Sequence, residues 1–150
     1  MSQSLSQILV HGTFSTKGRT PWLDDEVGPR MHAYLATVLR DKGHIPLIVG
    51  GYHDHVHVLF GLAKTSSISQ AMEDIKGSSS KWIKTLELGL DEFAWQRGYA
   101  AFSIGNSEID RTVQYIANQQ FHHGKTNFQD EFRLICKENN LDFNELYAWD

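Results

Sequence analysis

Apolar residues along the chain recur with two different periods, one typical of strands and one typical of helices. A strand is expected where every second residue is apolar, and a helix where apolar residues return every third or fourth position. These patterns predict strands at 5–14, 44–52, 54–62 and 98–104, and helices at 24–42, 67–88, 107–123 and 127–139. The order β-α-β-β-α-β followed by two helices is typical of a ferredoxin-like fold with a C-terminal extension.

This order of elements predicts an α+β protein with one antiparallel sheet. Two helices cover one face of the sheet in a ferredoxin-like fold, and we expect the C-terminal helix that carries Tyr115 to lie on the other face. No internal repeat or linker interrupts the sequence, so residues 1–150 are expected to form a single domain. The second face of the sheet is therefore where we look for chemistry.

Three histidines fall within five positions in the segment His53-Asp54-His55-Val56-His57. Because side chains of a strand alternate between faces, His55 and His57 share one face, and a regular strand places Asp54 on the other. Two imidazoles two residues apart on a rigid strand can both reach one divalent cation. The plainer alternative is a polar strand face whose histidines bind only water or backbone. His53 is expected on the same face, either as a group that supports the metal ligands or as a residue exposed to solvent.

The predicted helix at 107–123 carries a second group of polar side chains. Tyr115, Asn118, Gln119 and His122 are spaced i, i+3, i+4 and i+7, so they share one face of that helix. A phenol with a pKa near 10 is a poor nucleophile at neutral pH, and a cation that polarises a phosphate offsets this weakness. The alternative is a structural tyrosine whose ring is buried and whose hydroxyl lies at the boundary.

Together the two groups predict a metal-dependent phosphoryl-transfer site. His55 and His57 supply two metal ligands, Gln119 supplies a third, and Tyr115, one helical turn away, is the nucleophile. A side-chain amide oxygen suits Mg²⁺ or Mn²⁺, and imidazole favours Mn²⁺ over Ca²⁺. A hydrolase that binds metal through His53, His55 and His57, without a covalent intermediate, is an alternative that leaves the tyrosine helix unexplained.

Composition narrows the class of protein further. The 150 residues are 41% hydrophobic and 21% charged, as in an ordinary globular domain. The first residues lack the basic and apolar regions of a secretion signal, and no segment is apolar enough to span a membrane. We therefore expect a cytoplasmic protein. The single cysteine, Cys136, fits a reducing compartment and is expected to be buried on a helix.

The net charge of −4, with histidine neutral, argues against a protein that coats duplex DNA without specificity. A local basic patch or a bound cation can still supply phosphate contacts. The candidate contacts lie in the first loop, on the second helix and before the fourth strand, and they are Lys17, Arg19, Lys76, Lys81, Lys84 and Arg97. An ordinary solvated surface is an equal alternative for each lysine, and Trp82 is expected to pack in the core rather than to stack on bases.

The sequence resembles the single-tyrosine HUH transposases of insertion sequences of the IS200/IS605 group. The likeness runs nearly end to end through five ordered blocks, which are HGTFSTKGRTPWL at 11–23, GYHDHVHVLFGL at 51–62, WQRGYAAFSI at 95–104, YIANQQFHH at 115–123, and a Phe-x-x-Glu-Phe block at 128–132 before the closing YAWD. A His-x-His pattern alone is weak evidence, whereas five blocks in this order are specific.

The resemblance implies a role for each of four residues: His55 and His57 are the HUH pair, Tyr115 is the nucleophile and Gln119 is the third ligand. It implies that single-stranded DNA is cut to give a 5′-phosphotyrosine and a free 3′-OH, which later reseals the strand. It also implies a nucleoid-associated homodimer in which a tyrosine can serve the partner's histidines, and binding of DNA hairpins near element ends.

Two alternatives to an active transposase stay open. One is a DNA-hairpin-binding protein without catalysis, which would not need to retain all four site residues. The other is an HUH enzyme of plasmid replication or conjugation, which usually has additional domains and carries its tyrosine in a different sequence pattern.

Overall fold

The structure is a computed structural model that describes residues 2–150. Its four strands form one antiparallel sheet in the order β2-β3-β1-β4, from β1 (Leu9–Ser15), β2 (Ile45–Tyr52), β3 (His55–Gly61) and β4 (Ala100–Ile104). The helices are α1 (Val27–Asp41), α2 (Ile68–Lys84), α3 (Ile109–Ala117), α4 (Gln119–His122) and α5 (Phe128–Glu138), with short 3-10 helices η1 (Lys17–Arg19) and η2 (Asn106–Glu108). This is the α+β, ferredoxin-like arrangement predicted from the sequence.

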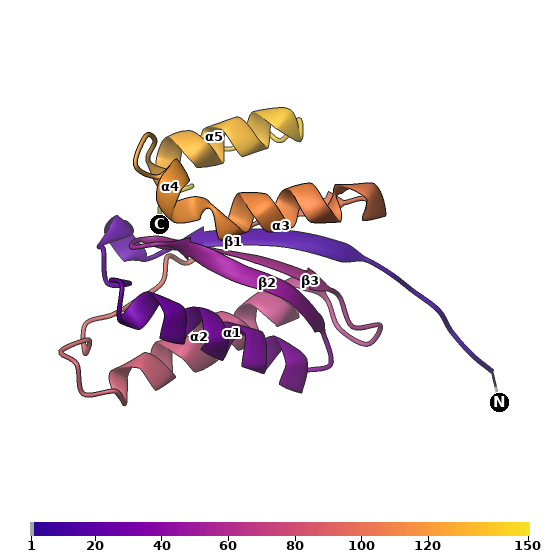
Figure 1. Cartoon of the computed structure of the whole chain (residues 1–150), viewed down its shortest axis with the longest axis horizontal. Coiled ribbons are helices and arrows are strands. Elements are labelled where there is room, and N and C mark those ends of the chain that lie inside the picture. Colours follow the sequence, from indigo (N-terminus) through magenta and orange to yellow (C-terminus); the bar gives the residue numbers. More distant parts are fainter. Residues whose placement is uncertain (1) are drawn as a thin grey trace.

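The sheet separates two layers of helices (Figure 1). Helices α1 and α2 cover one face, and α3, α4 and α5 lie over the other. The larger core forms between the sheet and the first pair, and its fully buried members include Val10, Phe14, Val56, Val58, Phe60, Met31, Leu35, Leu39, Met72 and Ile75. Because β3 alternates, the residues between these valines and Phe60 point toward α3, α4 and α5. The second face of the sheet thus receives the C-terminal helices, as predicted.

Strand pairing fixes which side chains share the second face. Residues directly opposite each other in an antiparallel pair lie on the same face, and Thr13 is opposite His57 in the β1–β3 pair. His11, two residues earlier on β1, therefore points to the same face. Strand β1 begins at Leu9 rather than at residue 5, because its two neighbours end there: Leu9 pairs with Gly61 on one side and Ile104 on the other.

The predicted continuous helix at 107–123 was wrong. Helix α3 ends at Ala117, and Asn118 has φ −97° and ψ 17°, which interrupts the helix before α4 begins at Gln119. Asparagine is common at such ends because its side chain competes with the helical backbone for hydrogen bonds. The interruption lets the chain change direction between α3 and α4, before it reaches α5 (Figure 1).

Helix α3 lies unusually close to β2 at a glycine. A Cβ atom on Gly50 would be 2.8 Å from the carbonyl oxygen of Ile116 and 2.9 Å from its Cγ2. Only a residue without a side chain allows this approach, so Gly50 sets the position of α3 on the sheet.

Helix α5 is held by its cap and by one apolar stripe. The side chain of Asn127 accepts a hydrogen bond from the backbone N–H of Asp130 at 2.8 Å, which caps the helix N-terminus. Phe128, Phe132 and Cys136 follow at helical spacing, are buried, and pack with Phe102, Phe143 and Trp149. The expectation that Cys136 is buried is confirmed. Trp82, stacked on Tyr34 with ring centroids 4.4 Å apart, also packs against the core as expected.

Among residues 2–150, none of the helices combines the length and the apolar character that crossing a membrane requires.

Candidate active site

Two histidines of β3 lie side by side on the face that the C-terminal helices cover. His55 and His57 are fully buried, and their ring centroids are 5.2 Å apart. They point the same way because they are two residues apart on a regular strand. Nε2 of each ring faces a side chain from the C-terminal helices. The strand therefore brings two potential nitrogen ligands to one place.

Glu131 of α5 lies at the centre of this group of side chains. It is 3% exposed, and its Oε1 lies 3.0 Å from Nε2 of His57 and 3.4 Å from Nε2 of His55. Gln119 adds an amide oxygen, because its Oε1 lies 2.9 Å from Nε2 of His55. The ligand atoms of His55, His57 and Glu131 all lie within 4.8 Å of one another. This nitrogen and oxygen set is of the kind that binds Mg²⁺ or Mn²⁺.

The two histidines are also held through their other ring nitrogens. Oδ1 of Asp54 lies 2.8 Å from Nδ1 of His55, and Nε2 of His11 lies 2.9 Å from Nδ1 of His57. Partners at Nδ1 fix the orientation of a ring and leave Nε2 for a metal. The expectation that Asp54 faces away was wrong, because β3 begins at His55 and Asp54 lies in the preceding turn, where strand alternation does not apply.

Tyr115 reaches the same place from α3. Its hydroxyl donates a hydrogen bond to Oε2 of Glu131, and its ring centroid lies 5.6 Å from that of His57. Gln119 also donates to this oxygen, from Nε2 at 3.0 Å. Tyr115 and Gln119 belong to different helices because of the interruption at Asn118, yet both side chains converge on Glu131. The four residues singled out in the sequence therefore meet within one chain.

Electrostatic coupling explains how these buried groups coexist. Burial acts to lower the pKa of His55, but hydrogen bonds with Asp54 and Glu131 outweigh it and raise this pKa to about 9. Burial acts to raise the pKa of Glu131, but the neighbouring imidazoles of His123, His55 and His57 hold it far below its usual range. Glu131 is thus a carboxylate, and a positive charge beside it is stabilised.

Three other groups on this face, His57, His11 and Tyr115, are neutral. Burial lowers the pKa of His57, and burial with the neighbouring His57 lowers the pKa of His11 to about 3. Burial raises the pKa of the Tyr115 phenol far above its ordinary value, and the charge of Glu131 adds to this effect. The phenol is therefore a donor in its hydrogen bond with Glu131, and a nearby cation is needed before its oxygen can become nucleophilic at neutral pH.

Two further histidines surround the second carboxylate oxygen. Nε2 of His123 lies 3.2 Å from Oε2 of Glu131, and Nε2 of His122 lies 3.4 Å from it. His122 was expected on the face of Tyr115, and it does lie there, with ring centroids 5.5 Å apart. His53 is outside this group, with a side chain that is 35% exposed and Nε2 3.2 Å from Oδ1 of Asp25. This geometry gives no support to a metal site that includes His53.

His55, His57, Gln119, Glu131 and Tyr115 are hereafter called the site cluster. Two of its members, Tyr115 and Glu131, line a cleft that opens to solvent. The cleft has a volume of about 530 Å³ and lies between β4, α3 and α5. Its walls include His11, Phe102, Arg111, Thr112, Tyr115, Glu131, Leu134 and Ile135. Tyr115 therefore borders an open depression rather than a sealed core.

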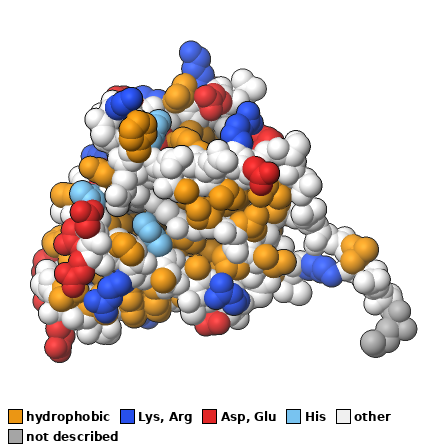
Figure 2. Space-filling view, viewed as in Figure 1, with side chains coloured by type: hydrophobic (Ala, Val, Ile, Leu, Met, Phe, Trp, Pro, Cys, Tyr) orange, Lys and Arg blue, Asp and Glu red, His pale blue; other side chains and the backbone are white. Residues whose placement is uncertain are grey.

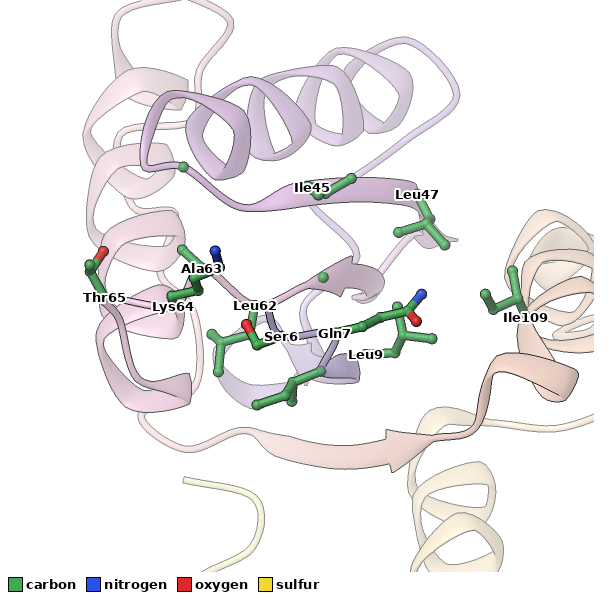
Figure 3. A pocket seen from close by; sticks show the side chains of 13 residues that line it. Ser6, Gln7, Leu9, Ile45, Leu47, Leu62, Ala63, Lys64, Thr65 and Ile109 are labelled. Atoms are coloured by element: carbon green, nitrogen blue, oxygen red, sulfur yellow. The ribbon is translucent and has the colours of Figure 1, made fainter. Parts of the chain in front are cut away.

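A second hollow, of about 560 Å³, lies at the opposite end of β3 (Figure 3). Its lining is mainly aliphatic and includes Leu9, Ile45, Leu47, Leu62 and Ile109. None of the site cluster lines it, so its chemistry is separate.

The predicted DNA contacts are distributed over several elements. Lys17 and Arg19 lie in η1, Lys81 is exposed on α2, and Arg97 precedes β4. Lys76 of α2 donates to the backbone oxygens of Arg97 and Gly98 at 2.9 and 2.8 Å. Lys84 is exposed at the end of α2. Figure 2 shows one side of the molecule, in the view of Figure 1. On that side the basic side chains are scattered among other residues, and several acidic side chains are gathered along the left edge.

The contribution of Glu131 was missed by sequence reasoning. The Phe-x-x-Glu-Phe block that contains Glu131 was recognised only as part of the family resemblance. Glu131 lies 74 positions beyond His57, and no spacing in the sequence links it to the histidines. The flanking Phe128 and Phe132 are both buried, and this was the available signal: a carboxylate between two inward-facing positions must itself be close to the interior.

The fold and the site cluster together define an α+β protein with a buried histidine-carboxylate group and a partly buried tyrosine on one face of an antiparallel sheet. The family model described as Transposase IS200 like matches residues 4–119. The chain belongs to this family of transposases. A search of curated protein sequences gave no match.

Solved structures share the fold. A protein described as a transposase, from Deinococcus radiodurans R1, superposes with a TM-score of 0.65 at 22% identity, covering 79% of this chain and 98% of that one. A REP-associated tyrosine transposase bound to a REP hairpin superposes with a TM-score of 0.60 at 19% identity, covering 84% of this chain and 76% of that one. At these identities the likeness is one of fold.

Proposed function

We propose that this transposase cuts and rejoins single-stranded DNA through a covalent bond between Tyr115 and a 5′-phosphate. The observation that carries the proposal is the convergence of Tyr115, His55, His57 and Gln119 around one carboxylate within a single chain. A structural tyrosine would not need two buried histidines, each with a partner at Nδ1, beside its hydroxyl.

His55, His57 and Gln119 would hold a divalent cation, either Mg²⁺ or Mn²⁺. Bound there, the cation supplies polarisation of the scissile phosphate and stabilises the charge that develops on it. The residues fit such an ion because all three are buried and Oε1 of Gln119 lies 2.9 Å from Nε2 of His55. Asp54 and His11 contact the Nδ1 atoms of the two histidines and so orient both rings.

In the proposed reaction the oxygen of Tyr115 forms a bond to phosphorus, and the bond from phosphorus to the 3′ oxygen breaks. The proton lost by the phenol is gained, in the net reaction, by the departing 3′ oxygen. The hydrogen bond to Glu131 holds the phenolic oxygen beside the histidine pair before the DNA arrives. Rejoining is the same reaction in reverse, with a 3′-OH as the attacking group.

We propose DNA hairpins at element ends as the folded part of the substrate, a choice supported by the fold shared with a protein bound to a REP hairpin. The homodimer implied by the resemblance remains a prediction. The contact of Tyr115 with Glu131 of the same chain favours a tyrosine that acts on its own site cluster.

The test uses purified full-length protein, single strands from the ends of its own element, and Mn²⁺ or Mg²⁺. We expect a DNA adduct that survives denaturation, that disappears in Tyr115→Phe and that persists in Tyr147→Phe. Tyr147 is the matched control because its side chain is 70% exposed. An adduct formed equally well by Tyr115→Phe contradicts the proposal, and hairpin binding without any adduct supports the non-catalytic alternative.

A further inference from the structure

Glu131 contacts the proposed metal ligands and the proposed nucleophile with different oxygens. Oε1 lies 3.0 Å from Nε2 of His57 and 3.4 Å from Nε2 of His55. Oε2 accepts hydrogen bonds from the hydroxyl of Tyr115 and from Nε2 of Gln119. One oxygen thus faces the histidine pair, and the other faces the tyrosine.

A divalent cation bound at the site cluster needs a negatively charged group beside it. A divalent cation held by His55, His57 and Gln119 alone would meet no negative charge, because imidazole binds a metal in its neutral form and an amide carries no charge. All three residues are less than 2% exposed. A buried charge without an opposite charge is costly, because the interior screens it poorly. Glu131 is the acidic member of both groups of potential metal ligands among the described residues.

Helix α5 holds Glu131 in a fixed position, as is required of a metal ligand. Its N-terminus is capped by Asn127, and Phe128 and Phe132, on either side of Glu131 in the helix, are buried. The helix packing therefore fixes the position of the carboxylate, so binding a cation there would not require a flexible segment to become ordered.

We propose that Glu131 is the anionic ligand of the metal, bound through Oε1, and that its Oε2 positions the hydroxyl of Tyr115 beside that metal. This inference rests on the proposed function for the need for a metal, and it adds a ligand from the C-terminal helix to the three predicted from the sequence. Docking of α5 and binding of the cation are then coupled, since each favours the other.

The experiment measures Mn²⁺ binding to full-length protein without DNA, by calorimetry. We expect Glu131→Gln, which preserves size but removes the charge, to lower the affinity about 100-fold or more, beyond the effect of losing an outer contact alone. Glu138→Gln is the control, because it removes the same charge from an exposed position of the same helix, and it should bind as the parent does. Equal affinity in Glu131→Gln and the parent overturns the inference.

A second measurement on the unaltered protein covers the case in which Glu131→Gln does not fold. Mn²⁺ broadens the NMR signals of nearby nuclei, so the side-chain carboxyl carbon of Glu131 should be the first glutamate signal to disappear during titration. Preferential broadening of any other glutamate overturns the inference. Because both measurements omit DNA, their failure is distinct from a failure to form the Tyr115 adduct.

Discussion

The hydroxyl of Tyr115 donates a hydrogen bond to Glu131, a residue 16 positions further along the same chain. The two side chains come from α3 and α5, which lie over the same face of the sheet (Figure 1). Within this one chain, Tyr115 therefore lies beside the histidine pair, and its ring centroid is 5.6 Å from that of His57.

The first prediction concerns this arrangement within one chain. Tyr115→Phe and His57→Ala should each be inactive, and a mixture of the two should be inactive as well, because neither chain contains both the nucleophile and the complete ligand set. The measurement is adduct formation on single-stranded DNA by the mixture after prolonged incubation. Recovered activity in the mixture would show that a tyrosine serves the partner's histidines, as the family resemblance implies.

A second prediction concerns Asp54, which lies 2.8 Å from Nδ1 of His55. Asp54→Asn should lower the affinity for Mn²⁺ about 10- to 100-fold, because the uncharged amide is a weaker partner for the ring and orients it less firmly than the carboxylate does. Asp25→Asn is the control, since Asp25 contacts the partly exposed His53 instead. Chelation with EDTA should abolish adduct formation by the parent, and added Mn²⁺ should restore it. Unchanged Mn²⁺ binding in Asp54→Asn would show that the contact has no orienting role.

The third prediction uses two glycines with opposite surroundings. Gly50→Ala should destabilise the protein by about 1–3 kcal/mol, because the new methyl group meets the backbone of Ile116 and pushes α3 from the sheet. Gly77→Ala, at an exposed position of α2 with nothing within 4 Å, should instead stabilise it by about 0.5–1 kcal/mol. Denaturant unfolding measures both. Equal stability of Gly50→Ala and the parent would show that the close approach of α3 is not needed.

The fourth prediction concerns His32 of α1. Burial lowers the pKa of this imidazole to about 4, with His55 acting in the same direction, and among the described residues its Nε2 has no hydrogen-bond partner. The unfolded chain therefore binds more protons than the folded one between about pH 4 and 6.5, so stability falls as the pH falls through this window.

Replacing His32 should remove part of this dependence. Between pH 7 and 5.5 the parent should lose up to about 1 kcal/mol that His32→Gln retains, a figure reduced by partial solvent screening. Parallel profiles for His32→Gln and the parent, measured by denaturant unfolding, would contradict the assignment.

Much of the fold could be predicted because it depends on local periodicity. The alternation through His55, Val56 and His57 placed the histidines correctly on the face opposite the main core. The interruption at Asn118 could not be predicted, because helical spacing continues through it and only the turn toward α5 requires it. Asp54 was misplaced because the strand was predicted to begin one residue too early: Asp54 lies in the turn before β3, where side chains do not alternate between faces.

The site cluster was less accessible than the fold. Tyr115 and Gln119 are close in sequence, so their proximity followed from helix geometry. Glu131 approaches from α5 through packing of Phe128 and Phe132, and such long-range packing has no signature in local spacing. The resemblance identified its block but did not assign a role to its carboxylate.

The position of Glu131 also has a consequence for synthesis of the protein. His55 and His57 leave the ribosome long before α5. A chain that ends before residue 131, either during synthesis or because of a stop codon, contains both histidines but lacks the Glu131 carboxylate of the site cluster. If the four-stranded sheet folds as it emerges, the chain holds its histidines without the partner that restrains Tyr115. Completion of the last helix would then be the event during translation that assembles the site.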